Sequence, residues 1–200
     1  AGIHCDGLPE VAVYTSDSHS LRPPVRLYAD EERNLLVLQS DVPVSPSSAS
    51  EFAGCITSLI AEMDATPIYI SGLDEQWDDV PAVYGVGVES GIDLVSEAGL
   101  APPVQTGLVS GPTGALLAAA EEQNLTAVGL ITQANVKFPD PQAARTTLKD
   151  GVTVLTGIEV ETETLVDQAE EIQKAREQLA ERLHQAGDES SQAQYLRGFH

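Results

Sequence analysis

Basic side chains are scarce in this chain. Its 200 residues include 31 Asp and Glu but only 10 Lys and Arg, so the formal net charge is −21. A surface of this sign repels nucleic acid and anionic lipid, so we expect neither nucleic acid nor a membrane as a partner. The charge fits a halophilic protein from a salt-rich cytosol, where molar salt shortens the screening length to about 3 Å.

Cysteines and long apolar runs are also few. Cys5 and Cys55 are too few for a disulfide framework, and the four His residues lack further ligands at zinc spacing, so we expect no metal site. The chain has no run of 18 apolar residues and no secretory leader. We therefore expect a cytoplasmic protein. The first residue is Ala1 instead of Met, so we also expect that residues precede it.

Alternating strand and helix patterns predict an α/β fold with a mostly parallel sheet and helices on both faces. We expect strands at 11–15, 67–73, 82–88, 104–109 and 127–131, and a hairpin from 25–29 and 35–39. Helical patterns follow Ser45–Ser48, whose hydroxyls can form an N-cap, and cover 91–99 and 115–123. Another helix begins at Asp140-Pro141, where Asp is a good cap and Pro a good first residue. A short helix or a strand is expected at 152–158.

The pattern changes after residue 160. From Thr162 to Ala186 the apolar residues Leu165, Ile172 and Leu179 repeat every seven positions, which predicts one charged helix roughly 37 Å long. This helix either folds back on its own domain or protrudes and mediates oligomer contacts. We therefore divide the chain into an α/β domain (1–160), a long helix (161–187) and a polar, mobile tail (188–200).

The end of this tail is aromatic. The last residues, Tyr195-Leu196-Arg197-Gly198-Phe199-His200, carry two rings in a chain whose aromatic content is 4%. Exposed rings on a mobile end favour docking into a pocket of a partner, with the terminal carboxylate bound by a cation. Chance placement, or packing against the protein's own surface, is the alternative.

A glycine-rich turn precedes the helix at 115–123. Gly111 and Gly114 flank Pro112-Thr113, and backbone N–H groups at such a turn can bind an anion, with Gly111, Thr113 and Gly114 as the binding residues. No Lys or Arg occurs between Arg33 and Lys137, so the turn lacks the Lys of a phosphate-binding loop. A plain strand-to-helix turn is the alternative, and we predict no cofactor.

No catalytic group stands out. Ser110 precedes Gly-Pro instead of lying in a Gly-x-Ser-x-Gly elbow, and no acid and histidine follow it in a triad arrangement. In a chain with 31 acids, the Asp78-Asp79 pair is read as solvated surface and not as a magnesium site.

Several short motifs resemble one family. The run Val109-Ser-Gly-Pro-Thr-Gly-Ala-Leu-Leu117, followed by Ala127-Val-Gly-Leu-Ile131 and Pro139-Asp-Pro-Gln-Ala-Ala144, is similar to the proteasome assembly chaperone family in its archaeal, haloarchaeal-type branch. Further matches upstream lie at Gly7–Tyr14, Leu21–Tyr28 and Ser40–Ser45, so the likeness covers nearly the whole chain.

This resemblance implies a three-layer α/β/α sandwich akin to the nucleoside phosphorylase and hydrolase fold, homo-oligomers, and proteasome α-subunits as partners. In that family a C-terminal hydrophobic-tyrosine-any tripeptide inserts between adjacent α-subunits, and Gly198, Phe199 and His200 occupy the matching positions. Phe199 lacks the hydroxyl and Gly198 lacks the side chain, so Leu196 is an alternative contact. The family also begins with a glycine-rich strand and helix that this chain does not show.

The functional prediction is a non-enzymatic, chaperone-like binding protein. The alternative is an enzyme or small-molecule-binding protein that uses the Gly111–Gly114 turn. Relatives have been described as ATP-grasp ligases, and proteins of related fold cleave glycosidic bonds, so the resemblance leaves this alternative open. A structural oligomer with another partner is a third possibility.

Overall fold

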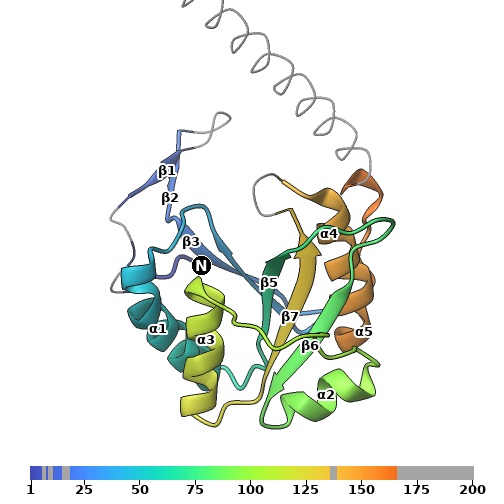
Figure 1. Ribbon diagram of the computed structural model, residues 1–200. Helices are drawn as coiled ribbons and strands as arrows, with labels where there is room; N and C mark the ends of the chain where they lie inside the picture. Colours follow the sequence, from blue (N-terminus) through green and yellow to red (C-terminus); the bar gives the residue numbers. More distant parts are fainter. Residues whose placement is uncertain (6–7, 9–10, 15–18, 136–138, 166–200) are drawn as a thin grey trace, which may run out of the picture.

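A three-stranded mixed sheet forms the centre of the molecule. The computed structural model describes residues 1–5, 8, 11–14, 19–135 and 139–165 (Figure 1). The strands β5 (Ile68–Asp74), β7 (Ala127–Ala134) and β6 (Val83–Val88) lie in the order β5-β7-β6. β7 pairs parallel with β5 and antiparallel with β6.

The prediction of a mostly parallel sheet is therefore wrong. Eight residues, 75–82, connect β5 to β6. A connection this short cannot carry the chain back to the opposite end of the sheet, which a parallel arrangement requires. β6 consequently begins near the end of β5 and runs in the opposite direction.

Helices cover both faces of the sheet, as expected (Figure 1). One face carries α1 (Ala49–Glu62) and α3 (Gly111–Glu122). The opposite face carries α2 (Gly91–Glu97), α4 (Pro141–Thr146), the π-helical turn η2 (Thr147–Val152) and α5 (Thr153–Thr156). The layering agrees with an α/β/α arrangement, while the likeness to nucleoside phosphorylases stays a prediction.

Side chains of β7 alternate between the two cores. Ala127 packs with Phe52, Ile56 and other residues of the α1–α3 face, whereas Val128 and Leu130 pack with the α2–α5 face. Both Val128 and Leu130 are almost completely buried. A strand that is buried on both sides has the near-continuous apolar sequence seen here, and this explains why β7 was predicted correctly.

Local sequence rules position the first turns of two helices. The short 3₁₀ turn η1 (Pro46–Ser48) precedes α1, and the Ser45 hydroxyl accepts a hydrogen bond from the Ser48 N–H. At α4 the Asp140 carboxylate accepts from the Ala143 N–H at 3.0 Å. Both caps satisfy N–H groups that a helix leaves free at its start, as the sequence predicted.

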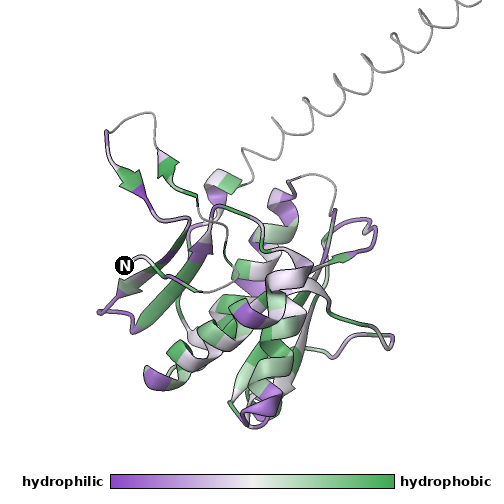
Figure 2. Cartoon of the chain, turned by 90° about the vertical axis from the view of Figure 1, so that its left-hand side faces the viewer, coloured by the Kyte–Doolittle hydropathy of each residue, from purple (hydrophilic) through white to green (hydrophobic). Residues whose placement is uncertain are grey.

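Two small hairpins project from the body (Figure 2). β3 (Val25–Asp30) and β4 (Leu35–Ser40) pair antiparallel and confirm the predicted hairpin. β1 (Val13–Tyr14) pairs with β2 (Leu21–Arg22). The chain start lies along β3, because the Ile3 N–H donates to the Val25 carbonyl and the Leu27 N–H donates to the Ala1 carbonyl.

Cys5 and Cys55 form a disulfide bond. It joins the N-terminal segment to α1 across a sequence separation of 50 residues. The sequence analysis did not anticipate this bond, because two cysteines so far apart in the sequence carry no pattern that places them together. The bond also removes the Cys5 thiol from any metal site with His4.

Of the other predicted helices and strands, some are confirmed and one strand is wrong. Helices at 91–99 and from 140 are confirmed, and the 152–158 segment is largely helical. The predicted strand at 104–109 is wrong, because these residues form no strand. Of the predicted long helix, only the part up to Leu165 belongs to the described residues. Within the described residues, no helix is both long and apolar enough to cross a membrane.

Candidate functional site

The predicted turn lies at the start of α3. Gly111 adopts a positive φ of 67°, and a Cβ placed there would meet nothing within 4 Å. A Cβ on Gly114, by contrast, would collide with the Val109 carbonyl oxygen. The two glycines therefore have different physical roles. Gly111 supplies a left-handed backbone conformation, and Gly114 allows a close approach between α3 and the preceding chain.

The Thr113 hydroxyl has a structural partner. It donates a hydrogen bond to the carbonyl oxygen of Ile70 in β5 at 3.1 Å. This contact ties the first turn of α3 to an edge strand of the sheet. Gly111, Thr113 and Gly114 thus lie in the first turn of α3, and the Thr113 proton is already used within the chain.

Immediately before this turn lies an exposed segment, residues 102–109, which we call the strap. It follows α2 and crosses in front of β6 and β7 to reach α3 (Figure 1). Val104 is 82% exposed and Leu108 is 99% exposed. Apolar side chains with this exposure contribute nothing to the core, so their position calls for a different account.

An open hollow of about 550 Å³ lies on another part of the surface. It is lined by residues 87–90, by Ile92 and Asp93, and by Glu121. The charged groups at its wall are Glu89, Asp93 and Glu121, all acidic. Such a wall repels phosphates and carboxylates. Among the described residues, no group of three His, Cys, Asp or Glu side chains is arranged to hold a metal ion.

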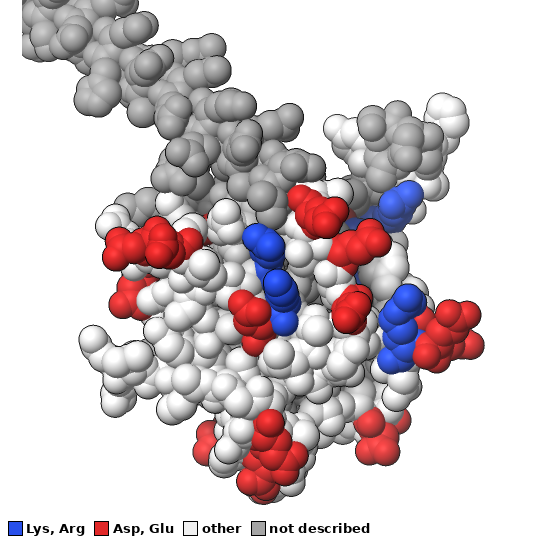
Figure 3. Space-filling view, turned by 90° about the vertical axis from the view of Figure 1, so that its right-hand side faces the viewer, with Lys and Arg blue, Asp and Glu red and all other residues white. Residues whose placement is uncertain are grey.

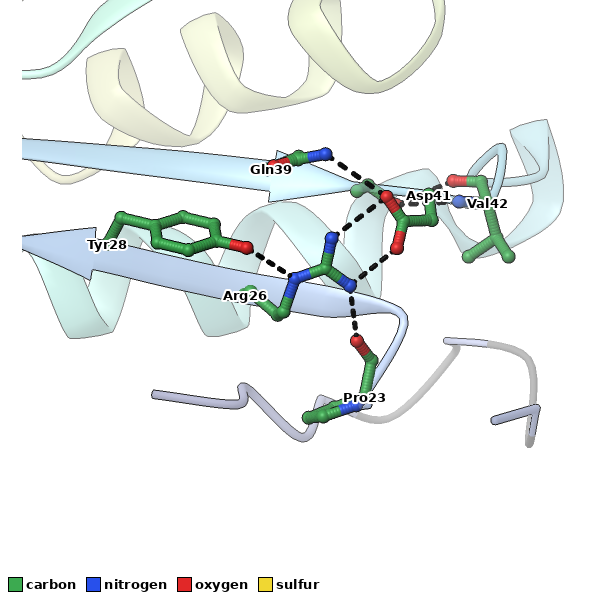
Figure 4. A network of polar contacts seen from close by, with 7 residues as sticks. Pro23, Arg26, Tyr28, Gln39, Asp41 and Val42 are labelled. Carbon is green, nitrogen blue, oxygen red and sulfur yellow. Dashed lines mark hydrogen bonds and ion pairs between the residues drawn. The ribbon is translucent and has the colours of Figure 1, made fainter. Parts of the chain in front are cut away.

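A polar network closes the base of the β3–β4 hairpin (Figure 4). The Arg26 guanidinium donates to the Asp41 carboxylate through both terminal nitrogens, to the Tyr28 hydroxyl at 2.8 Å and to the Pro23 carbonyl at 2.8 Å. Gln39 donates to the same carboxylate at 3.1 Å. These hydrogen bonds, above all those from Arg26, lower the pKa of Asp41 and raise that of Arg26.

Two buried hydroxyls lie between α1 and β5. Thr57 Oγ1 and the Tyr69 hydroxyl are both buried, and neither has a hydrogen-bond partner of regular geometry. Burial raises the pKa of Tyr69, and the nearby Thr57 hydroxyl opposes that rise. The opposing effect indicates that the two groups are close, while their geometry falls short of a hydrogen bond.

The remaining predicted site residues fall mostly outside the described residues. Leu165 is half-buried, and its N–H donates to the Thr162 carbonyl at 3.1 Å. The other members of the predicted oligomer helix and the C-terminal docking residues lie beyond the described part, namely Ile172, Leu179, Leu196, Gly198, Phe199 and His200. The Arg26 network and the strap are features that sequence reasoning did not identify.

Solved structures share this fold. PbaA of Pyrococcus furiosus, an archaeal homolog of proteasome-assembly chaperone, is 22% identical with a TM-score of 0.74, over 98% of this chain and 80% of that chain. A Thermoplasma acidophilum protein of unknown function is 21% identical with a TM-score of 0.72, over 95% of this chain and 77% of that chain.

PbaB of Pyrococcus furiosus, an archaeal proteasome activator, is 17% identical with a TM-score of 0.69, over 88% of this chain and 79% of that chain. Identities this low show a shared fold. No curated protein matches the chain. Residues 1–180 match the PAC2 family, and the chain therefore belongs to the PAC2 family.

Proposed function

We propose that this protein is a non-enzymatic, proteasome assembly chaperone-like subunit that binds proteasome α-subunits and associates with itself. The observation that carries the proposal is the PAC2 match over residues 1–180 together with the shared fold of PbaA and PbaB. It agrees with the family resemblance that the sequence motifs indicate.

The described surface supports a protein-binding role. Tyr14 and Leu21 are opposite each other in the β1–β2 pair and are 82% and 69% exposed. Val104 and Leu108 of the strap are exposed as well. Exposed large apolar side chains favour contact with another protein, because covering such surfaces removes them from water and lowers the free energy of the system.

Charge sets the kind of partner. Acidic side chains outnumber basic ones on the face that is on the right in Figure 1 (Figure 3). A net charge of −21 raises the association rate with a partner surface of positive potential and lowers it with acidic partners. We therefore propose that the α-subunit surface contacted by this protein presents Lys or Arg around an apolar pocket.

The C-terminal tail is the proposed docking element. Phe199 supplies the ring, Leu196 and Gly198 flank it, and the His200 carboxylate provides a terminal charge. A single aromatic side chain enclosed by a pocket contributes about 2 kcal/mol or more to binding. The wide-open hollow near Glu89 has no such enclosure, so the proposal places the docking contact on the tail and not in that hollow.

Pull-down of recombinant α-subunits at high salt tests both parts of the proposal. The intact chain should retain α-subunits, whereas a chain ending at Gln194 and the Phe199→Ala variant should retain several-fold less. The Ser190→Ala/Ser191→Ala variant alters the same tail without removing a ring, and it should bind like the intact chain. Failure of the intact chain to bind any α-subunit contradicts the chaperone role. Equal retention by all variants contradicts only the role of the tail.

The rival function, a small-molecule site at the α3 turn, has less support. The Thr113 hydroxyl proton is used by the Ile70 carbonyl, and no Lys or Arg occurs between Arg33 and Lys137 to neutralise a phosphate. Titration calorimetry with inorganic phosphate and with ATP and Mg²⁺ at high salt tests this rival. Millimolar or tighter binding that the Thr113→Val variant lacks would favour the small-molecule site.

A further inference from the structure

The strap is held at both ends and free in the middle. The Gly85 N–H of β6 donates to the Ala101 carbonyl at 2.9 Å just before the strap, and the Gly114 N–H donates to the Ser110 carbonyl just after it. Between these anchors, residues 102–109 make no hydrogen bond to any described residue. The backbone N–H and C=O groups of Val104 to Leu108 are therefore available to another chain.

The strap has the composition of a strand without a sheet. Pro102 and Pro103 restrict the backbone at its start, and the chain bends at Val104 and Gln105. A Cβ at Gly107 would meet nothing within 4 Å, so there is open space beside the chain. The valines and threonine give it the β-propensity on which the prediction of a strand at 104–109 rested. It lacks a pairing partner within this chain.

The strap and the residues that flank it in the sequence carry no charged side chain. Charged residues make up 20% of the chain, yet none occurs from Ala98 to Ala120. Two copies of a protein with a net charge of −21 repel each other, and the repulsion is smallest where both surfaces are uncharged. A basic partner would gain nothing from this region, because it offers no carboxylate to pair with.

We propose that the strap pairs antiparallel with the strap of a second copy of this chain, forming a two-stranded ladder across a twofold axis at Thr106. This inference rests on the self-association proposed above and assigns it a surface. Pairing requires the bend at Val104 and Gln105 to straighten. With Thr106 opposite its own copy, Val104 of one chain then lies opposite Leu108 of the other, on the same face of the ladder. The strap is thus complementary to itself, as an isologous interface requires.

This register uses the exposed residues. Val104, Thr106 and Leu108 are all exposed in the single chain, as are Gln105 and Gly107 between them. Pairing covers four apolar side chains, two from each copy, and places the two Thr106 side chains side by side. Cross-strand pairs of this kind each contribute a few tenths of a kcal/mol to about 1 kcal/mol, in addition to the burial of apolar area.

Light scattering coupled to size-exclusion chromatography at about 2 M KCl tests the pairing on the full chain without any proteasome subunit. The wild-type chain should have at least twice the monomer mass. Val104→Lys, Leu108→Lys and Thr106→Pro should lower that mass at equal protein concentration, the first two by placing charges in the interface and the third by removing an N–H. Val80→Lys is the matched control, because Val80 is an exposed valine like Val104 (66% exposed) but lies in the connection between β5 and β6.

Cysteine cross-linking provides a second measurement that leaves the fold intact. Thr106→Cys should form a covalent dimer under mild oxidation, since the two residues face each other. Gln105→Cys should not, because residue 105 lies opposite residue 107 in this register, and its own copy is too far away for a disulfide. The native cysteines are already paired with each other.

Two results overturn the inference. A wild-type chain that is monomeric at all salt concentrations refutes it together with the proposed self-association. A wild-type oligomer that loses mass in Ile172→Asp/Leu179→Asp but not in the strap variants refutes the strap alone and leaves self-association intact. The pull-down of α-subunits is a separate measurement, so neither result decides the chaperone role.

Discussion

Among the described core residues, the hydroxyls of Thr57 and Tyr69 are buried without a regular hydrogen bond. A folded chain normally satisfies such groups. A buried unsatisfied hydroxyl costs about 1 to 3 kcal/mol relative to its hydrated state. An apolar replacement of the same shape avoids this cost.

We therefore expect Thr57→Val to raise the free energy of unfolding by about 1 kcal/mol, measured by denaturant titration. Tyr69→Phe should act in the same direction. Ser58→Ala on the same helix is the control, because its hydroxyl already donates to the Gly54 carbonyl and lies at the surface. A loss of stability in Thr57→Val, restored when Tyr69→Phe is added, would show instead that the two hydroxyls bond to each other.

The Arg26–Asp41 pair makes a pH-dependent contribution to stability. Hydrogen bonds from Arg26 lower the pKa of Asp41 in the folded state relative to the unfolded chain. A lowered folded pKa stabilises the protein fully above the ordinary carboxyl pKa of about 4, and the stabilisation is lost as pH falls through the folded value. Stability should therefore decrease on acidification in this range.

Asp41→Asn removes the titrating group and should flatten this part of the stability–pH profile, measured by denaturant titration between about pH 2 and pH 6. The partial exposure of the pair keeps the effect modest. Asp64→Asn is a control at a carboxylate outside this network. An unchanged acid slope in Asp41→Asn would contradict the assignment.

The roles of single residues differ in how well the sequence predicts them. Asp140 and the hydroxyls of Ser45–Ser48 were predicted as caps from their residue types, and in the structure Asp140 and Ser45 each accept from the N–H three residues later. Arg26 and Asp41 are 15 positions apart, and only the β3–β4 pairing brings them together. No spacing rule covers such contacts, so a sequence-based prediction cannot find them without the fold.

At the scale of elements, strong local patterns were sufficient. The β3–β4 hairpin and α1 show apolar patterns next to recognisable turn or cap residues, and β7 shows a near-continuous apolar run. The prediction of a strand at 104–109 failed because β-propensity is a property of single residues, whereas a strand also needs a neighbouring strand to pair with. The antiparallel direction of β6 could be predicted from the sequence, because the 75–82 connection is too short for a parallel crossover.

The disulfide connects the N-terminal segment to α1, and Ile3 and Leu8 of that segment pack against the core cluster that contains Phe52 and Ile56. It closes a loop of about 50 residues between the N-terminal segment and α1, and cross-linking a loop of this length removes entropy from the unfolded chain. Cys5→Ser/Cys55→Ser should therefore lower the free energy of unfolding by about 4 kcal/mol or less relative to the oxidised wild type.

Reductant provides the matched comparison for this variant. Reduced wild type should resemble Cys5→Ser/Cys55→Ser, and reductant should have no effect on the variant itself. Thiol labelling of unfolded protein reports how much of the purified chain carries the bond. Equal stability of the oxidised wild type and the variant would contradict a stabilising role for the disulfide.

At the scale of the whole molecule, charge and assembly oppose each other. Thirty-one acids against ten bases give each copy a charge of −21, and an assembled protein brings these charges closer together. Low ionic strength leaves the repulsion acting over about 30 Å at 0.01 M, whereas about 1 M salt reduces it to roughly 3 Å. Salt should therefore favour both folding and self-association, by the same mechanism.

We expect the free energy of unfolding to fall steadily as KCl is lowered from about 2 M to about 0.1 M, and the oligomer to dissociate within this range. Denaturant titration and light scattering measure the two effects on the same samples. Asp78→Asn/Asp79→Asn removes two exposed negative charges and should shift both transitions to lower salt.

Sucrose separates screening from general stabilisation of the compact state, because it strengthens burial without screening charges. If repulsion between carboxylates is the cause, the oligomer should not form in a sucrose concentration that gives the same free energy of unfolding as KCl. The strap variant Leu108→Lys should retain the salt dependence of folding and lose the salt dependence of assembly. A chain that is fully stable and oligomeric in dilute buffer would contradict the electrostatic account. In that case apolar burial alone holds the molecule together.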